Sequence, residues 1–197
     1  HRMKIYKIAS PTFYHGTDSP EFNEFDSSKA TKGDQHYNPL GEAMYVTDKP
    51  DFANMFGKNV YEVDVPDDAK IKKINPSKAA SAIGDILNRA LKKVKIDYWS
   101  TDLNFKMVYQ EQIKKAEYSP YEAIIDAVSA VTAYFPKVAN EYEDWVSKIA
   151  TQKFAKFDVV VFVGTNNPND IFIGESPTQE ILIFNKAFQK VFREYKK

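Results

Sequence analysis

Residues 43–65 read AMYVTDKPDFANMFGKNVYEVDV, and this stretch predicts two strands with a short helix between them. Ala43 to Thr47 is short and rich in aromatic and β-branched residues, which favours a strand. Pro50 is well suited to the first turn of a helix, which we expect to run to about Phe56. Asn59 to Val65 then alternates as a half-buried strand does.

Further strands are predicted on both sides of this stretch. Toward the N-terminus, Lys4 to Ile8 and Thr12 to His15 are β-rich runs, and turn residues follow from Gly16 to Pro20. The polar residues 27–41 have no periodicity and predict a loop. In the last forty residues, apolar runs predict three more strands, at Asp158–Val163, Ile171–Ile173 and Gln179–Phe184.

A helical block separates the two groups of strands. Within residues 76–157, apolar residues recur at helical spacing, as at Ile83, Ile86, Leu87 and Ala90. Prolines at 120 and 136 divide the block into three or four helices. The order strands, helices, strands predicts an α+β fold, with the block of about 76–157 inserted between two halves of a sheet, rather than a doubly wound parallel sheet.

The composition indicates one globular domain. We assign residues 3–197 to it, and we interpret His1 and Arg2 as a tag remnant before Met3. The 27 Lys and Arg residues balance 27 Asp and Glu, so no overall field attracts nucleic acid or an anionic membrane. The chain has no cysteine, which excludes disulfides and thiolate catalysis and leads us to expect a cytoplasmic site of action. No apolar run has the roughly 18 residues of a membrane span, and we expect no membrane partner.

Common motifs for nucleotides and metals are missing. The seven glycines include no Gly-x-Gly, so neither the dinucleotide fingerprint nor the phosphate-binding loop is present. The three histidines, His1, His15 and His36, form no His-x-x-x-His pair. We therefore expect no metal, and any nucleotide site has to be of another kind.

Three segments together resemble one enzyme family. They are Phe13-Tyr14-His15-Gly16-Thr17, then Tyr45-Val46-Thr47-Asp48 with Phe56 eleven positions after Tyr45, then Gln179-Glu180-Ile181-Leu182-Ile183. In this order and in these strand contexts, they resemble the His-Tyr-Glu ADP-ribosyltransferases, a class that includes diphtheria-toxin-like toxins and the poly(ADP-ribose) polymerases. The resemblance covers roughly half of the chain. It implies a split β-sheet core, NAD as co-substrate, and His15, Tyr45 and Glu180 as catalytic residues.

The chemistry of the family explains the need for these residue types. Breaking the bond between nicotinamide and ribose develops oxocarbenium character at the ribose carbon, and a carboxylate such as Glu180 stabilises that charge. The flat cationic pyridinium suits stacking between two aromatic faces, which Tyr45 and Phe56 would provide. The family more often has Tyr at the second position, so Phe56 keeps the face and lacks the hydroxyl.

The first segment supplies the other cofactor-binding residues that the resemblance implies, His15, Gly16 and Thr17. His15 would hydrogen-bond a ribose hydroxyl, and Gly16 would let the backbone approach the nicotinamide amide. One departure concerns the residues before Tyr45. Family members often have Gly-x-Gly there, and this chain has Gly41-Glu42-Ala43.

The acceptor and the diphosphate site stay open. In related enzymes the loop before the catalytic Glu, here Gly174 to Thr178, faces the acceptor. Enzymes that modify arginine commonly have Glu or Gln two positions before that Glu, where this chain has Thr178, so arginine is not supported as acceptor. The sequence does not identify the residues that hold the NAD diphosphate. Lys29 and Lys32, in the polar loop, lie near the predicted site residues in sequence, but the charged side chains of a loop are usually only solvated.

These observations predict an NAD-dependent mono-ADP-ribosyltransferase that modifies a macromolecule, protein or nucleic acid, as a microbial or phage toxin or effector. An antitoxin or immunity protein is a possible further partner. An NAD glycohydrolase would use the same residues, with water in place of the acceptor. A non-enzymatic interaction module on the same scaffold becomes credible if the pocket is blocked. An RNA 2′-phosphotransferase would need additional His and Arg residues that the chain does not offer.

Overall fold

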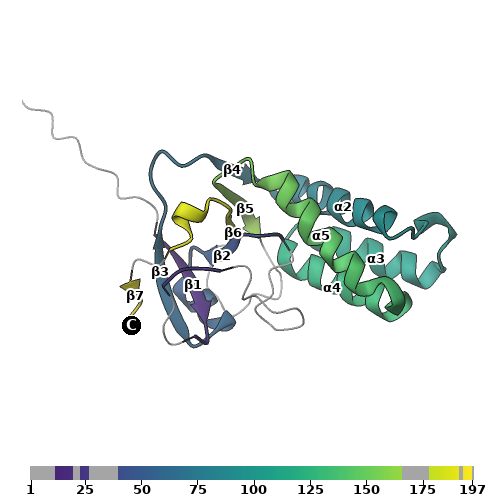
Figure 1. The fold of residues 1–197 in the computed structure, drawn as a ribbon, viewed down its shortest axis with the longest axis horizontal. Coiled ribbons are helices and arrows are strands. Elements are labelled where there is room, and N and C mark those ends of the chain that lie inside the picture. The colour runs from purple at the N-terminus through teal and green to yellow at the C-terminus, as the bar shows by residue number, and fades with distance from the viewer. Residues whose placement is uncertain (1–11, 20–22, 27–39, 166–177, 191–192, 197) are drawn as a thin grey trace, which may run out of the picture.

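The computed structural model describes residues 12–19, 23–26, 40–165, 178–190 and 193–196 (Figure 1). Within these ranges the strands form one mixed seven-stranded sheet in the order β4-β5-β6-β2-β1-β3-β7. All neighbouring pairs are antiparallel except β4 and β5. The strands are β1 (Thr12–Thr17), β2 (Met44–Thr47), β3 (Asn59–Asp64), β4 (Ile71–Ile74), β5 (Val159–Thr165), β6 (Thr178–Ile183) and β7 (Arg193–Glu194).

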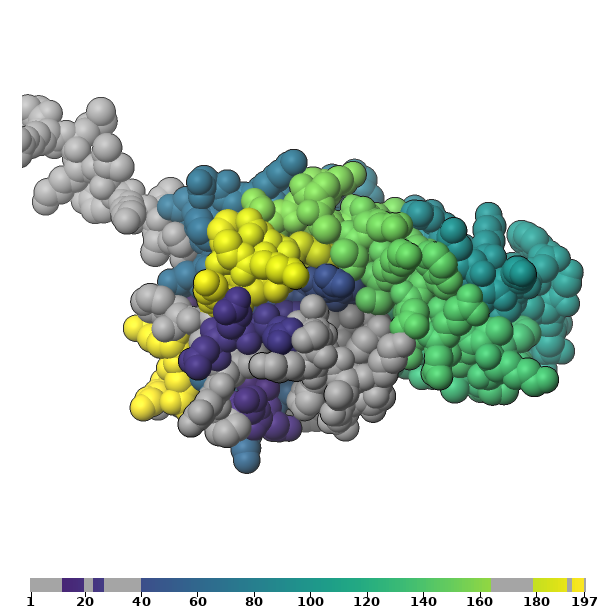
Figure 2. Space-filling model, viewed as in Figure 1, coloured from purple at the N-terminus to yellow at the C-terminus, as the bar shows by residue number. Residues whose placement is uncertain are grey.

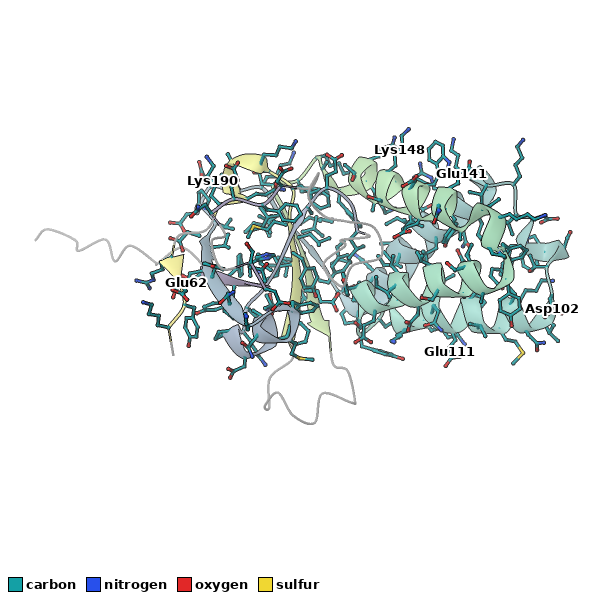
Figure 3. The ribbon with its side chains drawn as sticks, turned by 60° about the horizontal axis from the view of Figure 1, so that its bottom comes forward. Glu62, Asp102, Glu111, Glu141, Lys148 and Lys190 are labelled. Atoms are coloured by element: carbon teal, nitrogen blue, oxygen red, sulfur yellow. The ribbon has the colours of Figure 1, made fainter. Side chains whose placement is uncertain are left out.

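Four long helices between β4 and β5 form what we call the helical module, residues 76–154. It projects from the sheet as a separate lobe (Figures 1 and 2), and its charged side chains, such as Glu111, Glu141 and Lys148, point outward (Figure 3). The fold is therefore α+β, as the sequence predicts. The helices are α1 (Pro50–Ala53), α2 (Pro76–Lys93), α3 (Leu103–Lys115), α4 (Pro120–Tyr134) and α5 (Ala139–Phe154), with 3-10 turns η2 (Asn54–Phe56), η3 (Tyr98–Ser100), η4 (Pro136–Val138) and η5 (Lys186–Phe188).

The start of α2 shows how local sequence fixes a helix in this module. The side chain of Asn75 accepts a hydrogen bond from the Lys78 backbone N–H, and Pro76 occupies the first turn, where no N–H is needed. Lys92 and Lys93 lie in the last turn, where they complement the helix dipole. The buried face then packs into the core of the module.

The two faces of the sheet have separate cores. On one face, Val160, Phe162 and Leu182 pack against the helical module. On the other face, their strand neighbours Val159, Val161 and Ile181 form a smaller core, as the alternation of side chains along a strand requires. None of the described helices is long and apolar enough to cross a membrane.

Most predicted elements are confirmed, with shifted boundaries. β1 continues through Gly16 and Thr17, so the predicted turn begins only at Asp18. The predicted strands at 4–8 and 171–173 and most of the loop at 27–41 lie outside the described residues. β4 was not predicted because Ile71-Lys72-Lys73-Ile74 does not alternate. It is an edge strand, a place where exposed lysines are common.

Candidate active site

Three neighbouring strands carry the predicted catalytic residues. β2 lies between β1 and β6, and Thr47 pairs with Glu180 while Tyr45 pairs with Leu182. Because directly paired residues project to the same side of a sheet, Tyr45 and Glu180 share one face. Tyr45 packs with the core that the helical module covers, so this face looks toward the module.

His15 joins β1 to β2 through its side chain. Its Nδ1 lies 2.7 Å from the carbonyl oxygen of Tyr45. Because a carbonyl only accepts, Nδ1 carries the proton of this hydrogen bond. The two strands pair on the main chain at Tyr14 with Thr47, and the imidazole adds a side-chain contact between them at Tyr45.

Gly16 and Thr17 have structural reasons for their positions. A Cβ on Gly16 would lie 1.7 Å from the carbonyl oxygen of Ala53, so only glycine allows β1 to pass this close to α1. The hydroxyl of Thr17 accepts a hydrogen bond from the Ser19 N–H and closes the turn after β1. Neither observation needs a ligand, and neither conflicts with one.

An aromatic cluster surrounds Tyr45. Its ring centroid lies 5.3 Å from that of Phe56 and 5.1 Å from that of Tyr121, while Phe56 and Tyr121 are 6.0 Å apart. The ring centroid of Phe52 lies 5.4 Å from that of Phe56. A flat ring between two others needs about 7 Å, since each stacking contact takes about 3.5 Å. The planes of Tyr45 and Phe56 are tilted by 57°, so the two rings must turn toward parallel as well as separate by about 2 Å to admit a pyridinium between them.

The hydroxyl of Tyr45 is buried without a hydrogen-bond partner among the described residues. Burial raises the pKa of this phenol well above its ordinary value, and the neighbouring Glu180 and Tyr121 raise it further. The group therefore stays protonated and can donate. A buried polar atom without a partner is rare in native proteins, because it has lost its water without compensation.

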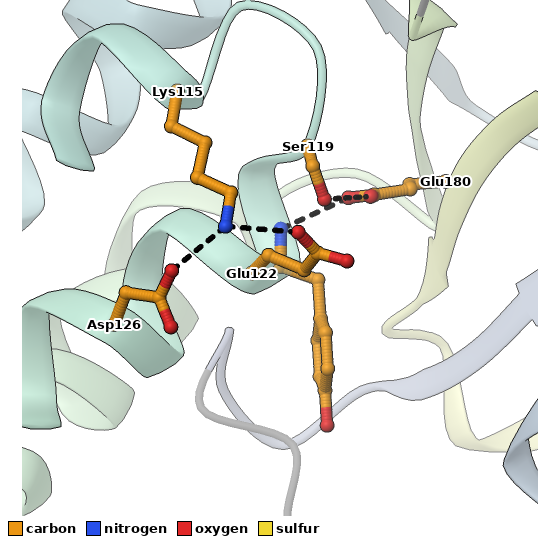
Figure 4. A network of polar contacts seen from close by, with 6 residues as sticks. Lys115, Ser119, Glu122, Asp126 and Glu180 are labelled. Atoms are coloured by element: carbon orange, nitrogen blue, oxygen red, sulfur yellow. Dashed lines mark hydrogen bonds and ion pairs between the residues drawn. The ribbon is translucent and has the colours of Figure 1, made fainter. Parts of the chain in front are cut away.

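Glu180 is 4% exposed, and the helical module holds its carboxylate (Figure 4). The Ser119 hydroxyl donates to Oε1 at 3.0 Å, and the Tyr121 backbone N–H donates to Oε2 at 3.0 Å. Sequence reasoning missed both residues. Ser119-Pro120 is a typical helix start, but nothing in the sequence pairs it with a strand sixty positions later.

Lys115, at the end of α3, stabilises the beginning of α4. Its Nζ lies 2.7 Å from Asp126 and 3.0 Å from Glu122. Although partial burial alone would lower the pKa of this ammonium, the hydrogen bonds to Asp126 and Glu122 raise it above its ordinary value. The lysine therefore keeps its charge, and the first turn of α4 keeps a fixed position beside Glu180.

The remaining predicted features lie elsewhere. Lys29, Lys32 and residues 174–177 of the acceptor loop fall outside the described residues. A cavity of about 500 Å³ is present at the far end of the module, lined by residues that include Leu91, Ile96 and Trp99. Its lining includes none of the predicted site residues.

Comparisons with protein-family models, with curated proteins and with solved structures gave no match to this chain. The functional argument therefore depends on the resemblance of the three motifs and on the geometry of the residues themselves.

Proposed function

We propose that the chain is an NAD-dependent mono-ADP-ribosyltransferase with an ADP-ribosyltransferase-like split sheet, acting on a macromolecule as a toxin or effector. One observation carries the proposal. The buried carboxylate of Glu180 and the aromatic pair of Tyr45 and Phe56, more than 120 residues apart in sequence, lie on one side of the sheet. The tyrosine hydroxyl beside them has no hydrogen-bond partner among the described residues.

Each residue has a role that fits NAD. Tyr45 and Phe56 would take the faces of the nicotinamide ring, and the Tyr45 hydroxyl would donate to a polar atom of the bound nucleotide. Glu180 would accept from a ribose hydroxyl, and His15 would hold the main chain at Tyr45 through the carbonyl that it binds. The buried hydroxyl of Tyr45 is the feature that the core alone does not explain.

The reaction needs little more than charge stabilisation. The bond between the ribose carbon and the nicotinamide nitrogen breaks, and its electron pair neutralises the pyridinium. Glu180 stabilises the positive charge left on the ribose, and a nucleophilic atom of the acceptor bonds to that carbon and loses its proton. Such a carboxylate contributes on the order of 10² to 10³ in rate.

Transfer of labelled ADP-ribose from NAD in cell lysate tests the proposal, with wild type compared to Glu180→Ala. We expect label in either the protein or the nucleic-acid fraction with wild type alone, which also identifies the class of acceptor. Free nicotinamide without label in either fraction would indicate the glycohydrolase instead.

One observation favours the non-enzymatic alternative. Glu180 is 4% exposed and the three rings touch, so this conformation closes the site. If wild type neither transfers label, releases nicotinamide nor binds NAD, the scaffold serves interaction and Glu180 serves as the cap of α4.

A further inference from the structure

The hydroxyl of Ser119 does not form the hydrogen bond that is usual for a residue at the start of a helix. It occupies the N-cap position of α4, where a serine hydroxyl ordinarily accepts a hydrogen bond from an N–H of the first turn. Here the side chain makes no such bond and donates to Glu180 instead. Ser119 is 6% exposed, so its hydroxyl lies within the protein and depends on this partner.

The carboxylate of Glu180 takes over the capping that Ser119 leaves undone. Pro120 has no N–H, and the next one, that of Tyr121, donates to Oε2 of Glu180. The positive end of the helix dipole also favours a negative charge at this place. Glu180 is thus held at both oxygens by one turn of the helical module.

The position of that turn is fixed from the side of α3. The Lys115 ammonium bridges Glu122 and Asp126, both on the first two turns of α4 (Figure 4). The connection itself is closed by the Ser119 N–H, which donates to the Lys115 carbonyl at 2.9 Å. Because these contacts hold the turn between α3 and α4 in place, the Ser119 hydroxyl has a fixed position beside Glu180.

We propose that Ser119 is a positioning residue for the catalytic carboxylate, so that the helical module contributes to the active site as well as to the fold. This inference rests on the proposed function. The two hydrogen bonds from Ser119 and from the Tyr121 N–H fix the rotation of the carboxylate. A carboxylate held in one orientation stabilises the positive charge that develops on the ribose better than one that rotates.

Steady-state release of nicotinamide from NAD tests this role in Ser119→Ala, Ser119→Thr and the control Ser129→Ala. Ser129 is an exposed serine of the same helix that bonds the Ile125 carbonyl. We expect Ser119→Ala to lower kcat about ten- to a hundredfold, the effect of losing one hydrogen bond to a charged group. KM for NAD should change little, because the hydroxyl acts through Glu180 and not on the substrate.

Ser119→Thr keeps a hydroxyl and should recover most of the lost kcat, while Ser129→Ala should behave as wild type. Thermal unfolding of each variant controls for folding. If Ser119 had only a structural role, its loss would lower the midpoint of thermal unfolding and would not lower kcat while leaving KM unchanged.

An unchanged or increased kcat in a folded Ser119→Ala enzyme would overturn the inference, because the hydroxyl would then only hold the site closed. A wild type that neither transfers label in cell lysate nor releases nicotinamide would reject the proposed function, and the positioning role with it. The wild-type measurement therefore tells the two failures apart.

Discussion

The helical module and the candidate site on the strands differ in the hydrogen bonding of their buried tyrosine hydroxyls. In the module, Tyr109 and Tyr142 are both fully buried, and their hydroxyls lie 2.8 Å apart as a hydrogen-bonded pair. In the site, the equally buried hydroxyl of Tyr45 has no such partner among the described residues. Pairing satisfies both groups in the first region, whereas the second region keeps an uncompensated polar atom.

The difference indicates what each region is built for. A satisfied pair adds to the stability and specificity of the core. An unpartnered buried donor lowers stability and persists where function requires it. The same Tyr→Phe change should therefore have opposite consequences in the two regions, which makes the comparison open to experiment.

The largest effect is expected from Glu180→Gln. This change keeps the size of the side chain but removes the charge that stabilises the ribose cation, so nicotinamide release should fall on the order of 10² to 10³. Glu62→Gln is a matched control, because Glu62 is also buried but pairs with Arg193 near the opposite edge of the sheet. If Glu180→Gln keeps full activity, Glu180 is only a cap of α4.

Tyr142→Phe should be the more destabilising of the two tyrosine changes. It leaves the hydroxyl of Tyr109 buried without a partner, which costs about 1–3 kcal/mol of the free energy of unfolding. Urea denaturation measures this value. Activity should remain at the wild-type level in buffer without urea, because no residue of the pair lies in the aromatic cluster around Tyr45.

Tyr45→Phe should leave the free energy of unfolding unchanged or raise it slightly, because it removes a polar atom that has no partner among the residues that the structure describes. KM for NAD should nevertheless rise a few-fold, since the variant loses one donor to the nucleotide. Destabilisation as large as in Tyr142→Phe would show that the hydroxyl has a partner in the folded protein, and the comparison between the regions would then break.

The smallest effect concerns Asp158, just before β5. Hydrogen bonds from the Lys70 backbone N–H and then from the Asn185 side chain lower the pKa of this carboxyl. A lowered folded-state pKa contributes stability above the ordinary value of about 3.9, and this contribution disappears as pH falls through the folded-state pKa.

Asp158→Asn should therefore lower the thermal midpoint at neutral pH, and the difference from wild type should shrink in acid. Asp67→Asn, in an exposed turn before β4, is the control. A difference that stays constant from pH 7 to pH 3 would mean that the lost contacts do not depend on the charge.

The order of elements was predictable from sequence because it depends on local patterns. Period-two alternation predicted β3, a buried apolar run predicted β5, and prolines marked the starts of α4 and η4. β4 was missed because Ile71-Lys72-Lys73-Ile74 does not alternate, and its parallel pairing with β5 depends on residues almost ninety positions away.

The candidate site could be predicted only in part, for a similar reason. The resemblance selected His15, Tyr45, Phe56 and Glu180 because these residues lie in short recognisable strings. Ser119 and Tyr121 lie in a block that matches no known motif, and their contact with Glu180 arises only when the module packs on the sheet. Gly16 shows the converse. The resemblance assigns it to ligand approach, but its close packing against Ala53 already requires glycine at this position.

The most direct test of the account is the affinity for NAD measured by calorimetry in wild type, Phe56→Ala and Phe52→Ala. Phe56 contacts Tyr45, whereas Phe52 contacts Phe56. Loss of one stacking face should weaken NAD binding by up to about thirtyfold in Phe56→Ala, the equivalent of about 0.5–2 kcal/mol, while Phe52→Ala binds as wild type does. Equal affinities in all three proteins, or no binding to wild type, would contradict an NAD site at this aromatic cluster.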